Sequence, residues 1–284
     1  MKGQDLKHRI TGARETVQIT RAMQLISTSK MSKSEKLMEQ SREFLSETEG
    51  IINRTEIGMH PFYETRENNR TIFIVVAANK GLCGDYNHRV LNLAEKEIIN
   101  CNTVKIYAVG QYCREHFNKK GIRTTNAYVN MMHQPFVDDA ALLADEVSNA
   151  FVDGICDCVK IIFTECMKNS HSSQTPVSRT VLPLEKSGIS EEKCTLEFKS
   201  DIDGILKQYI WAKIYYGVCS SFYTIDFKRM IAMQQATTNG EKLVSELEAK
   251  YNHLRQESIT SELLDANTAK LGIISMSESG GGSE

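Results

Sequence analysis

A short loop with two glycines is the first candidate for chemistry. The segment NKGLCGDYN (79–87) lies between an apolar run and a helical pattern, where nucleotide enzymes carry a phosphate-binding loop. Its glycines fit neither GxGxxG nor GxxxxGK(S/T), because no lysine and hydroxyl residue follow them. Cys83 would need a base, and no histidine completes a recognisable Cys/His signature. The loop therefore predicts a tight turn whose glycines supply unusual backbone angles, or a protein contact. Its candidate residues are Gly81, Leu82, Cys83, Gly84 and Asn87.

Cysteines are the second set of side chains that could do chemistry. They are scattered, without a CxxC pair and without histidines at zinc-finger spacing, so a structural zinc is not expected. The only close pair, CDC at 156–158, suits neither a disulfide nor a chelate. We expect reduced thiols in a reducing compartment, and no cofactor. The eight positions are Cys83, Cys101, Cys113, Cys156, Cys158, Cys166, Cys194 and Cys219.

Composition excludes several classes of protein. The chain has 284 residues, 41% of them hydrophobic, and a formal net charge of −2, which disfavours a generally basic nucleic-acid binder. Its longest purely apolar run, 72–78, is far shorter than the roughly 20 residues that cross a bilayer. The N-terminus is charged and unlike a signal peptide. We therefore expect a soluble, cytoplasmic protein.

The distribution of proline indicates two long terminal helices. Pro61, Pro135, Pro176 and Pro183 all lie in the middle of the chain, so segments 1–60 and 205–272 can each be helical almost throughout. Both segments carry apolar residues at alternating steps of three and four, which predicts an antiparallel coiled coil. The N-terminal seam is Leu6, Ile10, Ala13, Val17, Thr20 and Gln24. The C-terminal seam is Met230, Met233, Thr237, Gly240, Val244, Leu247, Tyr251 and Leu254, with Thr237 and Gly240 read as interruptions.

The middle of the chain has the pattern of an α/β domain. Apolar strands are predicted at 71–78, 104–110 and 159–167, with a helix at 89–100 after the first. Such alternation favours a doubly wound, Rossmann-like parallel sheet covered on both faces. We therefore predict an α/β fold in which a domain at 70–200 is inserted between the two helices of a long antiparallel coiled coil. The final segment, 275–284, ends in SGGGSE and is predicted to be a disordered tail.

Two stretches of the predicted helices are unusually polar. In RETVQITRAMQLISTSKM (14–31), threonine, serine and glutamine dilute the apolar residues on every face, so no broad apolar stripe is expected. In the C-terminal helix, the seam fades where several polar side chains occur together. These side chains are Arg255, Gln256, Thr260 and Glu262.

Three separated segments resemble the γ subunit family of F-type ATP synthase. They are RITGARETVQITRAMQLISTSK (9–30), GLCGDYN (81–87) and the run from KRMIAMQQATTNG (228–240) to YNHLRQESITSEL (251–263), in the family's order. Residues that match the N-terminal family pattern are Arg9, Ile10, Thr16, Ile19, Thr20, Ala22, Met23 and Lys30. Those that match the C-terminal pattern are Arg229, Met230, Met233, Ala236, Thr237, Asn239, Asn252, Arg255, Gln256, Ile259, Thr260 and Glu262.

The resemblance implies a noncatalytic rotor subunit. The terminal helices would form a shaft inside a ring of three α and three β subunits, and the α/β domain would form a foot on the ε subunit and the membrane c-ring. The complex would lie at the cytoplasmic face of the cell membrane. Polar side chains on such a shaft allow contacts that exchange with water. The implied contacts between rotor and stator are Met23, Lys30, Arg229, Arg255, Gln256, Thr260 and Glu262.

The chain departs from the family pattern in two places. Asp226 and Lys228 replace the usual glutamate and alanine before the ARM element, and LLDANTAKLGI (263–273) lacks the small glycine-alanine patch after Glu262. These departures predict a divergent member whose shaft tip fits its bearing differently. Two other hypotheses stay open: a nucleotide-binding α/β enzyme with coiled-coil oligomerisation arms, and a freestanding coiled-coil scaffold.

Overall fold

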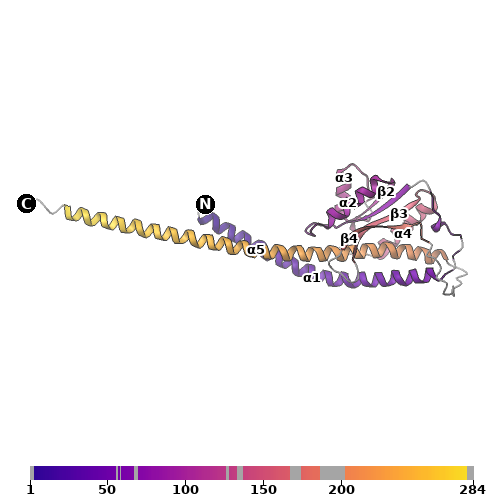
Figure 1. Cartoon of the computed structure of the whole chain (residues 1–284), viewed down its shortest axis with the longest axis horizontal. Coiled ribbons are helices and arrows are strands. Elements are labelled where there is room, and N and C mark those ends of the chain that lie inside the picture. Colours follow the sequence, from indigo (N-terminus) through magenta and orange to yellow (C-terminus); the bar gives the residue numbers. More distant parts are fainter. Residues whose placement is uncertain are drawn as a thin grey trace, which may run out of the picture. The chain divides into compact units, whose positions relative to one another are not determined.

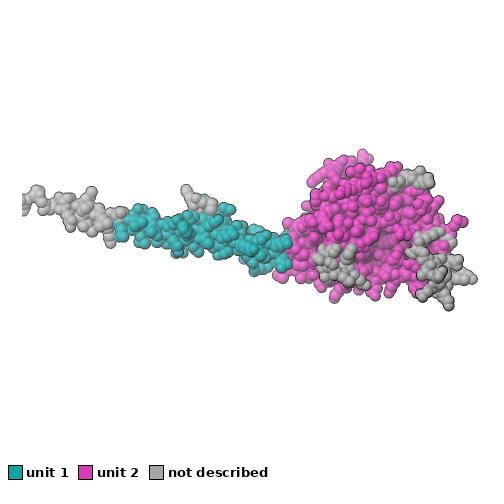
Figure 2. All heavy atoms as spheres, in the orientation of Figure 1, with its two compact units in different colours: residues 1–24, 233–284 teal, residues 25–232 magenta. Residues whose placement is uncertain are grey.

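The computed structural model divides the chain into two compact units. It describes residues 3–55, 57, 59–66, 70–125, 128–132, 137–166, 174–185 and 202–279. Unit 1 comprises Met1–Gln24 and Met233–Glu284, and unit 2 comprises Leu25–Ala232 (Figure 2). Two long helices, α1 (Gly3–Asn53) and α5 (Ile202–Ser279), each contribute residues to both units.

Unit 1 is a pair of antiparallel helical segments from α1 and α5 (Figure 1). Leu6, Ile10 and Leu247 form its small apolar core, with Ala13 and Tyr251 packed against them. The predicted seam is confirmed, because every residue in it except the exposed Leu254 is buried or half-buried.

The two predicted interruptions of the seam are contacts. Gly240 lies so close to α1 that a Cβ there would be 2.6 Å from Val17 Cγ2. Thr237 Oγ1 donates a hydrogen bond to Thr20 Oγ1 over 2.9 Å. A glycine and a pair of hydroxyl side chains thus let the helices approach where larger apolar residues would hold them apart. Ion pairs Arg14–Glu248 and Arg21–Glu241 flank this seam.

Unit 2 is built on a four-stranded sheet of order β2-β1-β3-β4. β1 (Arg70–Val76) pairs in parallel with β2 (Asn102–Val109) and with β3 (Cys158–Cys166), as the apolar runs predict. β4 (Gln174–Leu182) pairs antiparallel with β3. The expectation of an all-parallel sheet is therefore wrong at this strand. Only seven residues separate β3 from β4, fewer than the dozen or more that a crossover to a parallel strand needs, so β4 runs back along β3.

Helices cover both faces of the sheet (Figure 1). α2 (Tyr86–Ile99) connects β1 to β2, whereas α4 (Val137–Val152) lies in the connection from β2 back past β1 to β3. The connection from β1 to β2 and the connection from β2 to β3 run in opposite directions across the sheet. Because such connections are right-handed, α2 and α4 lie on opposite faces, and the predicted doubly wound arrangement is confirmed. The described part of the unit also contains the shorter helices η1 (Pro61–Tyr63), α3 (Gln111–Lys119) and η2 (Val129–Met132).

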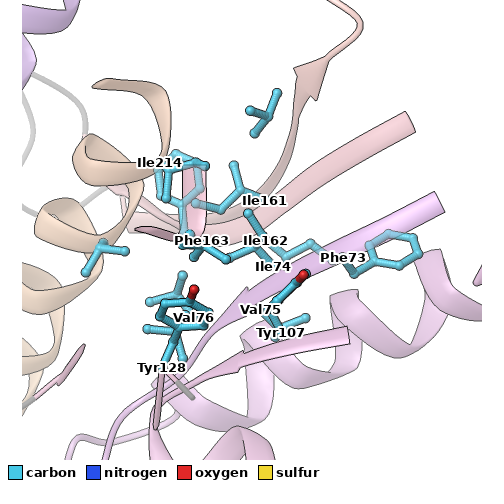
Figure 3. Close-up of a cluster of buried hydrophobic side chains, with 14 of the residues drawn as sticks. Phe73, Ile74, Val75, Val76, Tyr107, Tyr128, Ile161, Ile162, Phe163 and Ile214 are labelled. Atoms are coloured by element: carbon cyan, nitrogen blue, oxygen red, sulfur yellow. The ribbon is translucent and has the colours of Figure 1, made fainter. Parts of the chain in front are cut away.

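The core of unit 2 includes side chains from α1 and α5. Met38 and Ile52 of α1 and Leu206 and Ile210 of α5 belong to the same buried cluster as the apolar residues of the sheet. In Figure 3, Ile161 and Phe163 of β3 lie beside Ile214 of α5. Gly217 permits this approach, because a Cβ there would be 2.7 Å from Ile161 Cδ1. These parts of the long helices are therefore integral to the α/β fold.

The compact units do not follow the predicted segments 1–60, 70–200, 205–272 and 275–284. Both long helices are divided between the units, because the parts beside the sheet pack on it. α5 also continues to Ser279, inside the segment predicted to be a disordered tail. Residues 270–279 contain no proline, and the glycine run begins only at residue 280. Residues 280–284 lie outside the described part of the chain.

Candidate functional site

The loop between β1 and α2 contains two residues in the left-handed backbone region. Gly84 has φ 60°, so the prediction that this turn uses glycine's conformational freedom is confirmed. Leu82 has φ 62° and its side chain is 61% exposed. A leucine in this region is strained, because its Cβ crowds the following carbonyl oxygen. The loop thus holds a large apolar side chain out into solvent.

Asn87 fastens this loop to the end of β1. Its side-chain oxygen accepts a hydrogen bond from the Ala78 N–H over 2.9 Å, and its Nδ2 donates to Cys83 Sγ over 3.5 Å. Cys83 is almost fully buried, and burial raises the pKa of its thiol despite the nearby Arg229 guanidinium. A thiol held in its protonated form is a poor nucleophile. Cys83 and Asn87 therefore serve the packing of the loop.

Three backbone N–H groups beside the loop already have acceptors. Ala78 N–H donates to Asn87, Gln111 N–H donates to Asn79 Oδ1 over 3.0 Å, and Tyr112 N–H donates to the Ala78 carbonyl over 3.0 Å. Gly81 is packed against Tyr112, whose hydroxyl would lie 3.1 Å from a Cβ at this position. A phosphate cradle needs free N–H groups that converge on one point. These three N–H groups are therefore not available to a phosphate group.

Charged residues connect the loop to α5 within unit 2. Lys228 Nζ lies 3.4 Å from Asp85 Oδ1, and Arg89 at the start of α2 lies 3.8 Å from the other oxygen of Asp85. Lys228 stands where the family pattern usually has alanine, so this contact belongs to the divergent part of the sequence. The loop and the long helix are thus joined by a polar contact that sequence reasoning did not predict.

Two of the predicted contact residues flank a buried carboxylate. Asp226 is 2% exposed, and its Oδ1 accepts from Arg229 Nη1 over 3.0 Å. Its Oδ2 has no hydrogen-bond partner among the residues that the structure describes. Burial raises the pKa of Asp226, whereas the positive charges of Arg229 and Lys30 lower it. The structure therefore brings Lys30 of α1 and Arg229 of α5 together around Asp226. Sequence analysis had noted Asp226 only as a departure from a family pattern.

The remaining predicted contact residues belong to unit 1 and are not gathered into one site. Met23 is half-buried on α1. Every residue of α5 from Asn252 to Asp265 is exposed. Within this stretch, Thr260 Oγ1 donates to the Gln256 carbonyl over 2.9 Å, which is an internal helix contact. The exposed side chains predicted there are Arg255, Gln256, Thr260 and Glu262.

The surfaces of the long helices are less polar than predicted. Ile19, Leu25 and Ile26 of α1 are each more than half exposed. On α5, Ile259, Leu263 and Leu264 are also exposed. Polar residues separate these apolar side chains along the sequence, but the apolar side chains are nevertheless exposed on the surfaces of both helices. Both helices therefore offer apolar as well as polar groups for contacts with other proteins.

Within the described part of the chain, no group of three or more His, Cys, Asp or Glu side chains could hold a metal ion. The cysteines described there, at seven positions that exclude Cys194, are free thiols. None of the described helices combines the length and the apolar character needed to cross a membrane.

Solved structures similar to this chain include chains of mitochondrial ATP synthases. One chain in the Euglena gracilis ATP synthase structure of OSCP, F1 and c-ring matches with a TM-score of 0.69 and 16% identity, covering 99% of this chain and 96% of that one. A chain in the central stalk and c-ring structure from Tetrahymena thermophila matches with a TM-score of 0.53 and 17% identity, covering 77% of this chain and 99% of that one. At these identities, the matches support the fold.

Sequence relatives match along nearly the whole chain. The ATP synthase gamma chain of Halothermothrix orenii is 31% identical over 275 residues, which covers 92% of this chain and 95% of the relative. The gamma chain of Campylobacter curvus is 31% identical over 283 residues, with the same coverage. A family model described as ATP synthase matches residues 2–269. With the same fold, nearly the same length and the matched motifs at both ends, this chain belongs to the ATP synthase gamma chain family.

Proposed function

We propose that this gamma chain acts as a central-stalk rotor, coupling ion-driven rotation of a membrane ring to ATP synthesis or hydrolysis in the catalytic head. The proposal rests chiefly on α5, a single uninterrupted helix from Ile202 to Ser279. Its N-terminal part belongs to the core of the α/β fold, and its C-terminal part pairs with α1 in unit 1. A continuous helix can transmit torque between regions that make different contacts, because its backbone hydrogen bonds resist twisting and bending.

The partners in this proposal are the α and β subunits of the head, the ε subunit and the c-ring. The similar Euglena gracilis structure contains OSCP, F1 and the c-ring, and the similar Tetrahymena thermophila structure contains the central stalk and the c-ring. For this chain, we place the complex at the cytoplasmic face of a bacterial cell membrane, with the gamma chain peripheral to the bilayer. The α/β fold would contact ε and the c-ring, and the long helices would contact α and β.

The proposed rotor–stator contacts fall into two groups. Lys30 and Arg229 flank Asp226 in unit 2. Met23 and the exposed α5 residues Arg255, Gln256, Thr260 and Glu262 belong to unit 1. In the loop at 81–87, Leu82 is the side chain offered to a partner, while Gly81, Cys83, Gly84 and Asn87 hold the backbone that presents it.

Replacing Arg255 and Gln256 by alanine in the assembled complex tests the proposed role of the shaft. Both residues are exposed on α5, and polar contacts of this kind contribute about 1–3 kcal/mol each. We expect ATP turnover to fall about tenfold, which corresponds to a loss of ~1.4 kcal/mol, while the subunits copurify in normal ratio.

The matched control replaces Lys242 and Lys250 by alanine. Both are exposed on the part of α5 that is paired with α1, so turnover should stay unchanged. Normal ATP turnover in the Arg255→Ala, Gln256→Ala double variant would mean that these two residues do not transmit torque. Failure of the unmodified chain to assemble with α and β subunits would overturn the rotor function itself.

A further inference from the structure

Two adjacent serines of α5, Ser220 and Ser221, bond directly to the backbone of β3 inside unit 2. β1 pairs with β3 only as far as Ile162, whereas β3 continues to Cys166. Beyond that point, Ser221 Oγ accepts a hydrogen bond from the Thr164 N–H over 3.3 Å. Ser220 Oγ accepts from the Cys166 N–H over 3.3 Å and donates to the Thr164 carbonyl over 2.9 Å. Hydroxyl groups of a helix thus satisfy three backbone groups of a strand.

These hydrogen bonds lie in the interior of the unit. Ser220 and Ser221 are each 0% exposed, and Thr164 and Cys166 are each 4% exposed. A buried backbone group that loses its partner has no water to replace it, so breaking such a bond is costly. One turn earlier on α5, Gly217 lets the helix backbone approach β3 closely. The contact between α5 and β3 is therefore both close and difficult to break.

Hydrogen bonds fix the orientation of α5 in a way that apolar packing does not. Apolar burial has no preferred direction, whereas a hydrogen bond weakens steeply when its distance or angle changes. One residue of an α-helix corresponds to a rotation of about 100° and a rise of about 1.5 Å. A slip of α5 by one residue would therefore carry both hydroxyl groups away from β3 and break all three bonds.

The other long helix, α1, is fastened to the same end of β3. Arg42 Nη2 donates to the Cys166 carbonyl over 2.9 Å, and the Arg42 guanidinium lies 6.0 Å from the centroid of the Tyr216 ring of α5. A buried serine of α1 makes a different kind of contact. Ser34 Oγ lies 3.1 Å from the Lys30 carbonyl oxygen and 3.0 Å from the Met31 carbonyl oxygen, both in its own helix. Burial of a hydroxyl group therefore does not by itself connect a long helix to the sheet.

We propose that Ser220 and Ser221 are positioning residues that lock α5 against rotation on the sheet, so that torque passes between α5 and the α/β fold without slip. This inference rests on the rotor function proposed for the chain. Apolar contacts hold α5 against the sheet, while the two serines set its angle about its own axis and its position along that axis. Without their hydroxyl groups, α5 stays packed but twists through a wider range of angles.

Angular fluctuations of the α/β fold in an assembled complex without ATP test this rotational lock. The α and β subunits are fixed to a surface, and a bead is attached through Lys96→Cys, at an exposed position of α2, in the parent and in every variant. In the Ser220→Ala, Ser221→Ala double variant, we expect the mean-square angular fluctuation of the bead to rise several-fold. Ser221→Ala alone removes one of the three bonds and should give a smaller rise.

Two control variants separate the lock from a general loosening of the fold. Ser34→Ala removes a buried hydroxyl group whose contacts lie within its own helix. Ile106→Ala leaves a cavity in β2, which β1 separates from β3, and therefore lowers stability without touching the serines. Both controls should leave the angular fluctuation of the bead at the parent value.

An unchanged angular fluctuation in the double variant would overturn the lock. An equal rise in Ile106→Ala would overturn it too, because the effect would then be a general loosening. If the double variant does not assemble, Ser221→Ala alone is decisive, and an unchanged fluctuation there overturns the lock. Failure of the bead to rotate when ATP is added to the parent complex would instead refute the rotor function on which the inference rests.

Discussion

Leu82 and Gly84 share a left-handed backbone, but only glycine adopts it without strain. No heavy atom lies within 4 Å of a Cβ built on Gly84, so a side chain there would meet a backbone penalty and not a clash. Gly84→Val should therefore lower the free energy of unfolding by about 1–3 kcal/mol, measured from the urea midpoint at constant slope. Gly12→Ala is the control, since Gly12 lies in α1 with open space around it. This change should stabilise the protein by up to about 1 kcal/mol; equal destabilisation by both changes would contradict the backbone argument.

Asp226 should make stability depend on pH. Burial raises its pKa in the folded protein above the ordinary value of 3.8, so the folded state holds this proton more tightly than the unfolded chain does. Its contribution to stability is then greatest at low pH and decreases as pH rises through the window above 3.8. Asp226→Asn keeps an oxygen for Arg229 but cannot ionise. We expect this variant to be more stable than the parent at neutral pH and indistinguishable from it at the acid end.

Urea midpoints measured across the acid range test this expectation for Asp226. Asp145→Asn is the control, because Asp145 is exposed on α4 and its replacement should leave the pH profile unchanged. Lower stability of Asp226→Asn at neutral pH would mean that the ion pair with Arg229 outweighs the cost of burying the charge.

The sequence predicted the residues whose roles depend on their own backbone, and not those whose roles depend on distant partners. Gly84 falls in the first class, since glycine at a tight turn has a local meaning. Asn87 falls in the second, because its acceptor role toward Ala78 exists only after β1 and α2 have packed. Asp226 is similar: its surroundings include Lys30 from the opposite end of the sequence. No local pattern contains that information.

At the scale of elements, Gly240 and Val17 set how closely the two helices of unit 1 approach. A Cβ on Gly240 would lie 2.6 Å from Val17 Cγ2, so Gly240→Val should separate the helices and destabilise the pair by about 1–3 kcal/mol. Val17→Ala removes the opposing methyl groups and should restore part of this loss when combined with Gly240→Val. Amide hydrogen exchange of the seam around Leu6 and Ile10 reports on this unit specifically. If the stability changes of Gly240→Val and Val17→Ala simply add in the double variant, the two residues are not in direct contact.

The elements themselves were largely predictable, with β4 as the exception. Continuous β-branched runs gave the three parallel strands, and seams at three- and four-residue steps gave the paired helices. The sequence of β4, QTPVSRTVL, is polar and contains Pro176, which ordinarily argues against a strand. Here Pro176 lies on the terminal strand of the sheet, where a proline is tolerated. That β4 lies at the edge depends on how the whole sheet is ordered, which the strand's own sequence does not reveal.

At the scale of the whole molecule, the sequence indicated an inserted domain but not how the helices share in it. The proline-free ends and their seams at three- and four-residue steps suggested a coiled coil separate from the α/β domain. The structure instead uses α1 residues such as Met38 and α5 residues such as Ile210 to complete the core under the sheet. The residues that pack under the sheet occupy only part of each helix. The apolar character averaged over the 51 residues of α1 or the 78 residues of α5 therefore conceals where the helix is buried.

The chain as a whole should neither bind ATP tightly nor hydrolyse it. At the carboxyl ends of β1 and β2, where α/β sheets ordinarily take nucleotides, the Ala78, Gln111 and Tyr112 N–H groups already donate to protein acceptors. The backbone of Gly110 also lies close to β1, because a Cβ there would be 1.9 Å from the Ala77 carbonyl oxygen. Calorimetric titration of the purified chain with Mg-ATP should give no saturable heat at micromolar concentrations, and phosphate release should match buffer. The assembled head serves as the positive control in both measurements. Micromolar binding that Gly84→Val weakens would instead identify the loop as a nucleotide site and revive the enzyme hypothesis.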